Sequence, residues 1–456
     1  MNAIGWIFTL IASLFLLALP RHLAGIPLLI SAAYMTRGQE IELGLAHFPV
    51  VRILITIGFI RVIFKGERIV GGMNQVDRFL IIWAIWLIGS SIFHTSGAWV
   101  FRSGIIWTDL GCYFLFRIFI QNWEDVRRNF KILCIIIIPV SAAMLMEKMT
   151  GNNYFAALGG VNAMASLRDG HFRAQGPFAH AILAGTVGAA CLAMALYLWK
   201  DHRKYAVAGL FSSVGIVFAS TSSGPIMMVL FILFGLIIWK VRQHLCAIRW
   251  FILIAVIALD VIMKDPVYFL MARIDFGGGS KGWHRARLIQ SSMEHLNEWW
   301  LIGTDYTRHW MPTGIHANEI HTDITNHLLG MGVMGGLPLM LIWVMVIVAV
   351  FSQIGKMLRQ NENMPIEQQF LIWTLGAIMF GHTINYFSIS YFDQSIVFFY
   401  LVLASISAVQ YGESSATVVT KQLVERINPP HYAMMELNKM KGNYSVTSIS
   451  GKRARG

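Results

Sequence analysis

Two histidines and a carboxylate stand at the mouth of an apolar stretch. The segment HTDITNHLLGMGVMGG, residues 321–336, places His321, Asp323 and His327 directly before or within the first turn of a helix that continues as LPLMLIWVMVIVAVF. A histidine accepts a proton near neutral pH, which suits His321 to the role of general base. His327 lies a turn into the helix and fits better as a partner within a helix bundle.

The same region also holds residue types that could bind a metal. Its possible ligands are His316, Glu319, His321, Asp323 and His327. Their spacing is not that of HExxH, and no cysteine accompanies them, so we expect no metal and no cofactor. The nearby glycines permit close approach of helices, which is the usual role of small residues in membranes.

An arginine precedes a second apolar stretch. In RAQGPFAHAILAG, Arg173 stands before the turn Gly176–Pro177, and His180 follows at the start of the helix. Helix N-termini and arginine side chains both bind phosphate, so Arg173 and His180 are candidates for substrate binding. The alternative is an arginine that reaches lipid headgroups.

The segment GWHRARLIQSSMEHLNEWW predicts an amphipathic helix on or near a membrane surface. Its apolar positions are Leu288, Ile289, Met293, Leu296 and Trp300. Arg285 and Arg287 lie in the first turn. Two residues apart on a helix, they need not share a face, so we expect only one to point into a site. The alternative is a basic surface helix without a catalytic part.

Composition sets the class of protein that positions these residues. The chain has 456 residues, of which 56% are hydrophobic and 13% are charged. A soluble protein carries about a quarter charged residues. Many uncharged apolar runs are long enough, or nearly so, to cross a hydrocarbon core of ~30 Å as helices. The sequence therefore predicts an all-α, polytopic membrane protein.

We expect 12 or 13 transmembrane helices, because the second apolar segment is short. The segments lie near 4–20, 23–35, 50–64, 79–93, 98–120, 131–147, 180–199, 205–220, 224–240, 249–263, 326–351, 369–388 and 395–409. They form a transmembrane domain over residues 1–410. Residues 411–456 form a polar, basic tail that we expect to be cytoplasmic and disordered.

Charge predicts the orientation. The net charge of +12 points to topology and anionic headgroups rather than to nucleic acid. Short basic loops such as NWEDVRRNFK and KDHRK are expected on the cytoplasmic side. Two long connections, about 148–180 and 264–325, then lie on the opposite side, which in a bacterium is the periplasm.

The combination of these residues predicts a reaction. Arginines bind phosphate, and a histidine takes a proton from a hydroxyl. Together they suit transfer of a group from a lipid-linked diphosphate to an alcohol, with the arginines stabilising the departing diphosphate.

At these residues the sequence resembles the O-antigen ligase and O-antigen polymerase superfamily, over about residues 80–410. RAQGPFAH is similar to the first arginine motif of the family, with Arg173 in the place of its arginine. WHRARLIQSSMEHLNEWWLIGTD is similar to the second. Counting back from Gly303 favours Arg285 as the arginine of this second motif, with Arg287 as a competitor.

HTDITNHLLGMGVMG resembles the histidine motif of the family, in which His321 is followed by the two glycines Gly332 and Gly335. Two departures stand beside this match. Thr322 occupies a position where the family prefers Asn, Ser or Gln, and EWWLIGTD lacks the proline and second glycine common in the second arginine segment.

The resemblance implies a multi-pass protein of the bacterial inner membrane with a GT-C-type glycosyltransferase architecture and a large periplasmic loop. It implies an undecaprenyl-diphosphate-linked glycan donor, inversion at the anomeric carbon and no metal requirement. The acceptor would be lipid A core in a ligase of lipopolysaccharide biosynthesis, or another glycan in an O-antigen or exopolysaccharide polymerase.

The resemblance also implies roles for the candidate residues. Arg173 and Arg285 would bind the diphosphate, with Arg287 in support. His321 would act as the general base, and Asp323 would orient the acceptor. His180 and His327 remain candidates for substrate binding.

A different hypothesis is a transporter or flippase of lipid-linked saccharides. Arg102, Asp109, Arg117 and Asp260 fall in apolar segments, where ionisable residues are functional candidates. Pairing across helices also explains them, and no internal repeat of the transporter kind is apparent. A third hypothesis is a scaffold whose basic tail binds anionic lipid or a partner.

Overall fold

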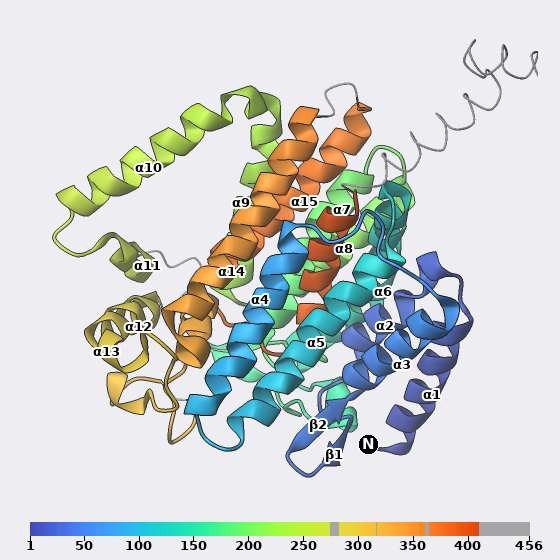
Figure 1. The fold of residues 1–456 in the computed structure, drawn as a ribbon, viewed down its shortest axis with the longest axis horizontal. Coiled ribbons are helices and arrows are strands. Elements are labelled where there is room, and N and C mark those ends of the chain that lie inside the picture. Colours follow the sequence, from blue (N-terminus) through green and yellow to red (C-terminus); the bar gives the residue numbers. More distant parts are fainter. Residues whose placement is uncertain (274–281, 316, 361–363, 410–456) are drawn as a thin grey trace, which may run out of the picture. The chain divides into compact units, whose positions relative to one another are not determined.

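The computed structural model describes residues 1–273, 282–315, 317–360 and 364–409. The predicted tail, residues 411–456, and His316 therefore lie outside the described residues. Each of the thirteen predicted apolar segments coincides with a helix (Figure 1). These helices are α1 (Ala3–Ala18), α2 (Ile26–Tyr34), α3 (Val50–Lys65), α4 (Gln75–Ser90), α5 (Ala98–Phe119), α6 (Trp123–Thr150), α7 (Ala181–Leu198), α8 (Arg203–Ser220), α9 (Ser223–Ile238), α10 (Leu245–Ile262), α14 (His327–Gln360), α15 (Ile366–Asn385) and an unnumbered helix Ile396–Val409.

Several of these helices can span a membrane. Within the described residues, five stretches are long and apolar enough to do so: Gln75–Phe93, Trp123–Thr150, Ala181–Leu198, Ser223–Ile262 and His327–Gln360. The fourth joins α9 to α10 through the short helix η4 (Trp239–His244). Two shorter helices, Ala3–Ala18 and Ile396–Val409, are also apolar. The predicted membrane-spanning helical class is supported, and the number of 12 or 13 crossings stays a prediction.

Local sequence explains where these helices begin and end. Asn74 caps α4 by accepting the backbone N–H of Asp77, whose carboxylate accepts the N–H of Asn74 in return. Asn122 caps α6 by accepting the backbone N–H of Asp125, and α6 ends at Gly151 in the left-handed region. These signals fix α6 as a single long helix.

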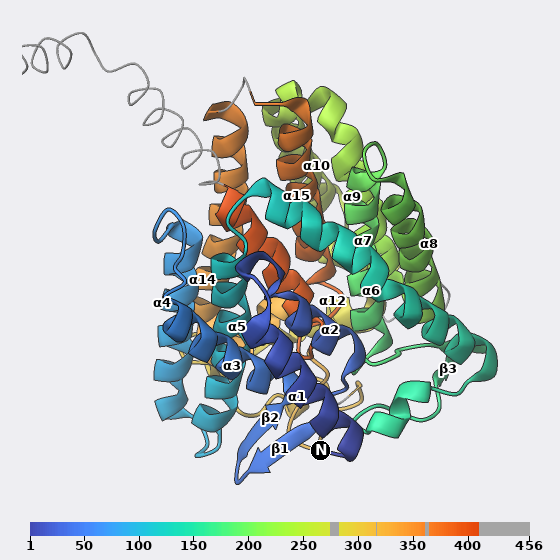
Figure 2. The ribbon, with the colours of Figure 1, turned by 90° about the vertical axis from the view of Figure 1, so that its right-hand side faces the viewer.

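The central helix of the bundle is α7, whose residues are nearly all buried. It packs against α6, α8, α9 and α15, as Figure 2 shows from the side. Small residues such as Gly185 and Gly188 let its neighbours approach closely: a Cβ on Gly188 would lie 2.9 Å from Ile216. The N-terminus of α7 is thereby held at a fixed place in the bundle.

The long connections carry short elements of their own. Strands β1 (Glu40–Leu43) and β2 (Ala46–Pro49) form one antiparallel hairpin, and β3 (Ser166–Arg168) and β4 (His171–Arg173) form another. The described part of the 264–325 connection holds η5 (Val267–Phe269), α11 (Leu270–Arg273), α12 (Gly282–Glu294), α13 (Leu296–Trp299) and η6 (Arg308–Trp310). The hairpin β1–β2 lies at the lower end of the bundle in both views, and α12 and α13 lie toward that end in Figure 1.

The predicted amphipathic helix is confirmed as a helical segment, but it breaks near His295 into α12 and α13. Leu288 is buried, whereas Met293, Leu296 and Trp300 are exposed. The exposed apolar residues at i, i+3 and i+7 leave one face of this segment free to contact lipid.

Helix α14 is interrupted near its start. Gly335 and Gly336 leave helical geometry, and Gly336 has a φ of 78°. The hydrogen bond from Leu337 N to Val333 O that a regular helix would make is replaced by two bonds to the preceding loop. Leu337 N donates to Trp300 O at 2.7 Å, and Thr304 N donates to Val333 O at 2.9 Å. The loop and the interrupted helix therefore satisfy each other's open backbone hydrogen-bonding groups.

Candidate functional site

One cavity of about 690 Å³ collects most of the predicted residues. Arg285, His321, Asp323, His180 and His327 all line it. Its wall comes from α5, α12, the N-terminal turns of α3, α7 and α14, the hairpin β3–β4, and the loops near residues 36, 320 and 390. Segments that are far apart in sequence thus meet at one end of the bundle.

Arg285 reaches the cavity from the first turns of α12. Its guanidinium is largely buried, and its Nε has no hydrogen-bond partner among the described residues. Burial and the charge of Arg168 lower the pKa of Arg285 to about 10, while Asp323 acts in the opposite direction. The side chain therefore keeps its positive charge at neutral pH and faces the cavity with bonding capacity unused.

Arg287 points elsewhere, because two residues on an α-helix are about 200° apart. Its guanidinium lies 3.3 Å from the carboxylate of Glu294, and its side chain is 37% exposed. It is not among the cavity residues. The structure thus separates two arginines that sequence spacing alone could not distinguish.

Arg173 ends β4 and is buried. It donates to Ser222 Oγ at 2.9 Å, and its Nε has no partner among the described residues. Burial, together with the charges of Arg168 and Arg285, lowers the pKa of Arg173 to about 10. Arg173 is not part of the cavity wall, but it is electrostatically coupled to the two arginines that are, so the three form one cationic cluster.

The Gly176–Pro177 turn that follows Arg173 is held by a carboxylate. Glu147, buried near the end of α6, accepts Gln175 N at 3.0 Å and Gly176 N at 2.8 Å. Ala174 N donates to Ala219 O at 3.0 Å. The predicted turn is confirmed, and Glu147 fixes it through contacts that sequence reasoning missed.

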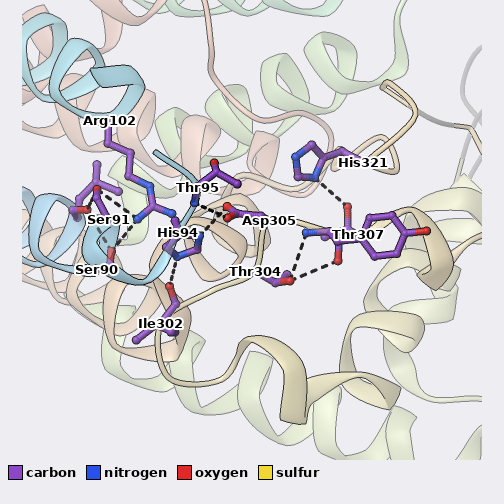
Figure 3. Close-up of polar contacts among 12 residues, drawn as sticks. Ser90, Ser91, His94, Thr95, Arg102, Ile302, Thr304, Asp305, Thr307 and His321 are labelled. Carbon is purple, nitrogen blue, oxygen red and sulfur yellow. Dashed lines mark hydrogen bonds and ion pairs between the residues drawn. The ribbon is translucent and has the colours of Figure 1, made fainter. Parts of the chain in front are cut away.

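His321 is half-buried on the loop before α14. Its Nδ1 lies 3.3 Å from Thr307 Oγ1, and its backbone N–H donates to Asn318 at 2.7 Å (Figure 3). Burial lowers the pKa of His321, which a weaker attraction to Asp305 only partly opposes. The imidazole is therefore neutral at pH 7, the form that accepts a proton.

The loop beside His321 is anchored by a second histidine. His94 Nδ1 lies 2.6 Å from Asp305, and His94 Nε2 lies 2.8 Å from Ile302 O. Burial alone would raise the pKa of Asp305, but hydrogen bonds from His94 and from Thr95 N outweigh it and lower this pKa. Figure 3 shows this anchor beside Thr307 and His321. The contact spans about two hundred residues, so no local pattern signalled it.

The remaining candidates are held in place by backbone contacts. Asp323 O lies 3.1 Å from His284 Nε2. His180 caps α7, its Nδ1 accepting Ile182 N at 3.1 Å. His327 Nδ1 accepts Tyr391 N at 3.2 Å. Each of these contacts fixes the residue at the cavity wall.

His327 also packs among aromatic rings. The centroids of Trp343, Tyr386 and Tyr391 lie 5.4, 4.6 and 5.2 Å from its own. This environment fits the expected role of His327 as a partner within the bundle. His327 also lines the cavity, which keeps it a candidate for substrate binding.

Several cavity residues were not singled out from the sequence. Arg37 donates to Phe392 O at 2.9 Å, and Arg52 donates to Thr108 at 2.9 Å. Asp393 accepts Ala179 N at 2.8 Å. All three line the cavity, and their hydrogen bonds join the segments that form its wall. Their partners lie far along the chain or on another element, so spacing gave no signal.

The ionisable residues that motivated the transporter hypothesis have protein partners. Arg102 donates to Ser90 at 3.0 Å, and Arg117 lies 3.8 Å from Asp77. Asp109 accepts a hydrogen bond from Tyr400 at 3.2 Å. These contacts join neighbouring helices, as structural pairing predicts. Asp260, at the end of α10, accepts Val267 N at 2.9 Å.

The chain was compared with known protein families and with curated proteins. No protein-family model matches the chain, and no curated protein matches it.

Proposed function

We propose that this protein transfers a glycan from undecaprenyl diphosphate to an acceptor hydroxyl, as an O-antigen ligase or as an O-antigen or exopolysaccharide polymerase. One observation carries the proposal. Arg168, Arg285 and the neutral His321 line one cavity, and the buried guanidiniums of Arg173 and Arg285 each keep an Nε without a partner among the described residues. Such a site suits a ligand that brings several negative oxygen atoms.

The chemistry of the step follows from these groups. The acceptor oxygen attacks the anomeric carbon, and the bond from that carbon to the diphosphate oxygen breaks. His321 takes the hydroxyl proton, while the diphosphate leaves with the electron pair and is stabilised by Arg173 and Arg285. Asp323 lies beside His321 on the same loop and orients the acceptor. The arginines supply the positive charge, so the proposal calls for no metal at this site.

The rest of the proposal concerns location. The protein is a multi-pass protein of a bacterial inner membrane, with a GT-C-type architecture and with the cavity facing the periplasm. Its partners are the lipid-linked donor, a glycan or lipid A core acceptor and the bilayer. The apolar helices and the basic loops between them support this arrangement.

The test is a deletion strain complemented with wild type, His321→Ala, Arg285→Ala or the control Arg287→Ala. Lipid-linked and finished glycans are extracted and sized on a gel. Long glycan left on the carrier beside bare core lipid identifies a ligase, and single repeat units identify a polymerase. Glycans unchanged in both His321→Ala and Arg285→Ala would overturn the proposal.

A further inference from the structure

A cluster of metal-binding side chains lies outside the cavity. His295 and Glu298 belong to the α12–α13 segment, and His309 belongs to η6. The three side chains each offer one ligand atom, and these atoms lie within 4.8 Å of one another. None of the three residues lines the cavity, so the cluster is separate from the proposed site of glycan transfer.

The spacing of the ligand atoms fits a small tetrahedral ion. Ligands bound to Zn²⁺ at 2.0–2.1 Å are separated from each other by about 3.3 Å. His309 Nε2 already lies 2.9 Å from Glu298 Oε2. His295 and Glu298 are three residues apart, a spacing that places both side chains on one face of a helical turn. A side-chain movement of an ångström or so would bring all three atoms to an ion.

His295 and Glu298 are each also held by an outer hydrogen bond of the kind found at zinc sites, and an aromatic ring stacks on His309. His295 Nδ1 lies 2.8 Å from Ser291 O, so this nitrogen carries the proton and Nε2 keeps its lone pair for an ion. Trp310 Nε1 donates to Glu298 Oε2 at 3.0 Å. Tyr306 stacks on His309 with ring centroids 4.9 Å apart.

The second group of this kind among the described residues provides a contrast. Glu40, Glu42 and His47 lie on the hairpin β1–β2. His47 contacts Glu40 at 3.2 Å, but its side chain is 51% exposed. Two acids and one exposed histidine resemble an ordinary solvated surface, whereas two half-buried histidines with one exposed carboxylate have the ligand types of a zinc site with one open position.

We propose that His295, Glu298 and His309 bind a divalent transition-metal ion of the Zn²⁺ class, with water in the fourth position. The ion joins the α12–α13 segment to η6. Thr307, which faces His321, lies two residues before His309, so the ion restrains the loop that borders the cavity. The inference stands on this cluster alone and is independent of the proposed glycan transfer.

The experiment is isothermal titration of the purified full-length protein in detergent with ZnCl₂, after treatment with a chelator. Wild type should bind one Zn²⁺ tightly. His295→Ala, Glu298→Gln and His309→Ala should each weaken this binding by at least tenfold, and Glu294→Gln, an exposed carboxylate on the same segment, should leave it unchanged. Trp310→Phe keeps every ligand and should weaken binding about 10- to 100-fold through the lost outer contact.

A second readout uses Co²⁺, whose absorption spectrum reports tetrahedral coordination by nitrogen and oxygen. The spectrum should appear with wild type and Glu294→Gln and be lost with Glu298→Gln. If wild type shows no stoichiometric Zn²⁺ binding, or if the three ligand variants bind as wild type does, the proposal is wrong. Both readouts measure the bound metal directly. A variant that folds poorly is recognised by its size-exclusion profile, and Trp310→Phe is then used in its place.

Discussion

The arginines of two regions of this molecule are bonded differently. At the junction of α1 and α3, Arg61 is 1% exposed and fully engaged: its Nε lies 3.1 Å from Glu67, and its Nη1 donates to Leu16 O and Leu19 O at 2.6 and 2.7 Å. Arg285, in the cavity wall, and Arg173, outside it, each leave a buried Nε without a partner among the described residues.

The contrast is between a charge that stabilises the fold and charges left open to a ligand. Arg61 satisfies the carbonyl groups left open at the end of α1 and neutralises a carboxylate, so its charge stabilises the fold. A buried guanidinium with unused donors destabilises the fold unless a ligand completes it. We infer that the cavity arginines are kept for what they bind.

The largest expected effect is a loss of stability when Arg61, the arginine with a structural role, is replaced. Arg61→Met removes the charge while keeping most of the apolar stem, and it leaves Glu67 without its partner. The loss of stability should be about 3–5 kcal/mol, the usual result of removing one member of a buried pair. Thermal unfolding of the purified protein in detergent measures it. An unchanged midpoint would show that Arg61 does not stabilise the fold.

Arg285→Met and Arg173→Met test the functional side. Glycan transfer should fall by about 10²- to 10³-fold, as when one donor to a developing anion is removed. The thermal midpoint should stay the same or rise, because a poorly paired buried charge disappears. Glycan transfer is assayed with extracted lipid-linked donor. Arg287→Met, which loses only an exposed ion pair, is the matched control and should change transfer by less than about threefold.

Glu147→Gln sharpens the comparison, because this buried carboxylate contacts two backbone N–H groups and not an arginine. The amide presents an N–H where one backbone N–H needs an acceptor, so stability should fall by about 1–3 kcal/mol. Transfer should fall as the turn behind Arg173 loosens. Glu124→Gln, at the exposed start of α6, should cost no more than about 1 kcal/mol. Thermal unfolding of both variants, measured side by side, gives the answer.

The pH dependence of transfer separates the histidine from the arginines. His321 must be neutral to accept a proton, and burial lowers its pKa below 6.5. Transfer should therefore hold steady from pH 7 until the arginines begin to lose their charge, and on the acid side it should fall only below pH 6.5, by at most tenfold per pH unit. Loss of charge on Arg173 and Arg285, whose pKa values are about 10, should cause a second fall near pH 10. A pH–rate profile of His321→Ala that keeps the acid limb would exclude His321 as the base.

Sequence patterns predicted the helices well and the site in part. All thirteen apolar segments coincide with helices, because a run of uncharged apolar residues is a local property of the chain. The Gly176–Pro177 turn and the helical segment after residue 282 were predicted for the same reason. The break near His295 was not, because the predicted periodicity continues through it.

The rest depends on contacts between distant residues. Sequence spacing left Arg285 and Arg287 open, and only the packing of α12 separates them. Glu147 meets Gly176 across 29 positions, and Asp393 meets Ala179 across 214. Arg168 gave no stronger signal than any loop arginine. Periodicity carries no information about such pairs, so these residues emerge only from the fold.

The exchange of hydrogen bonds between α14 and its preceding loop limits how this protein can change in length. The break at Gly335–Gly336 leaves Leu337 N and Val333 O without helical partners. Trp300 O accepts the hydrogen bond from Leu337 N, and Thr304 N donates to Val333 O. A Cβ on Gly303 would meet Val333 O at 2.2 Å, so the two backbones cross without room for side chains. One residue inserted or deleted between 300 and 304 would shift both bonds out of register. Natural relatives should therefore keep this five-residue spacing fixed.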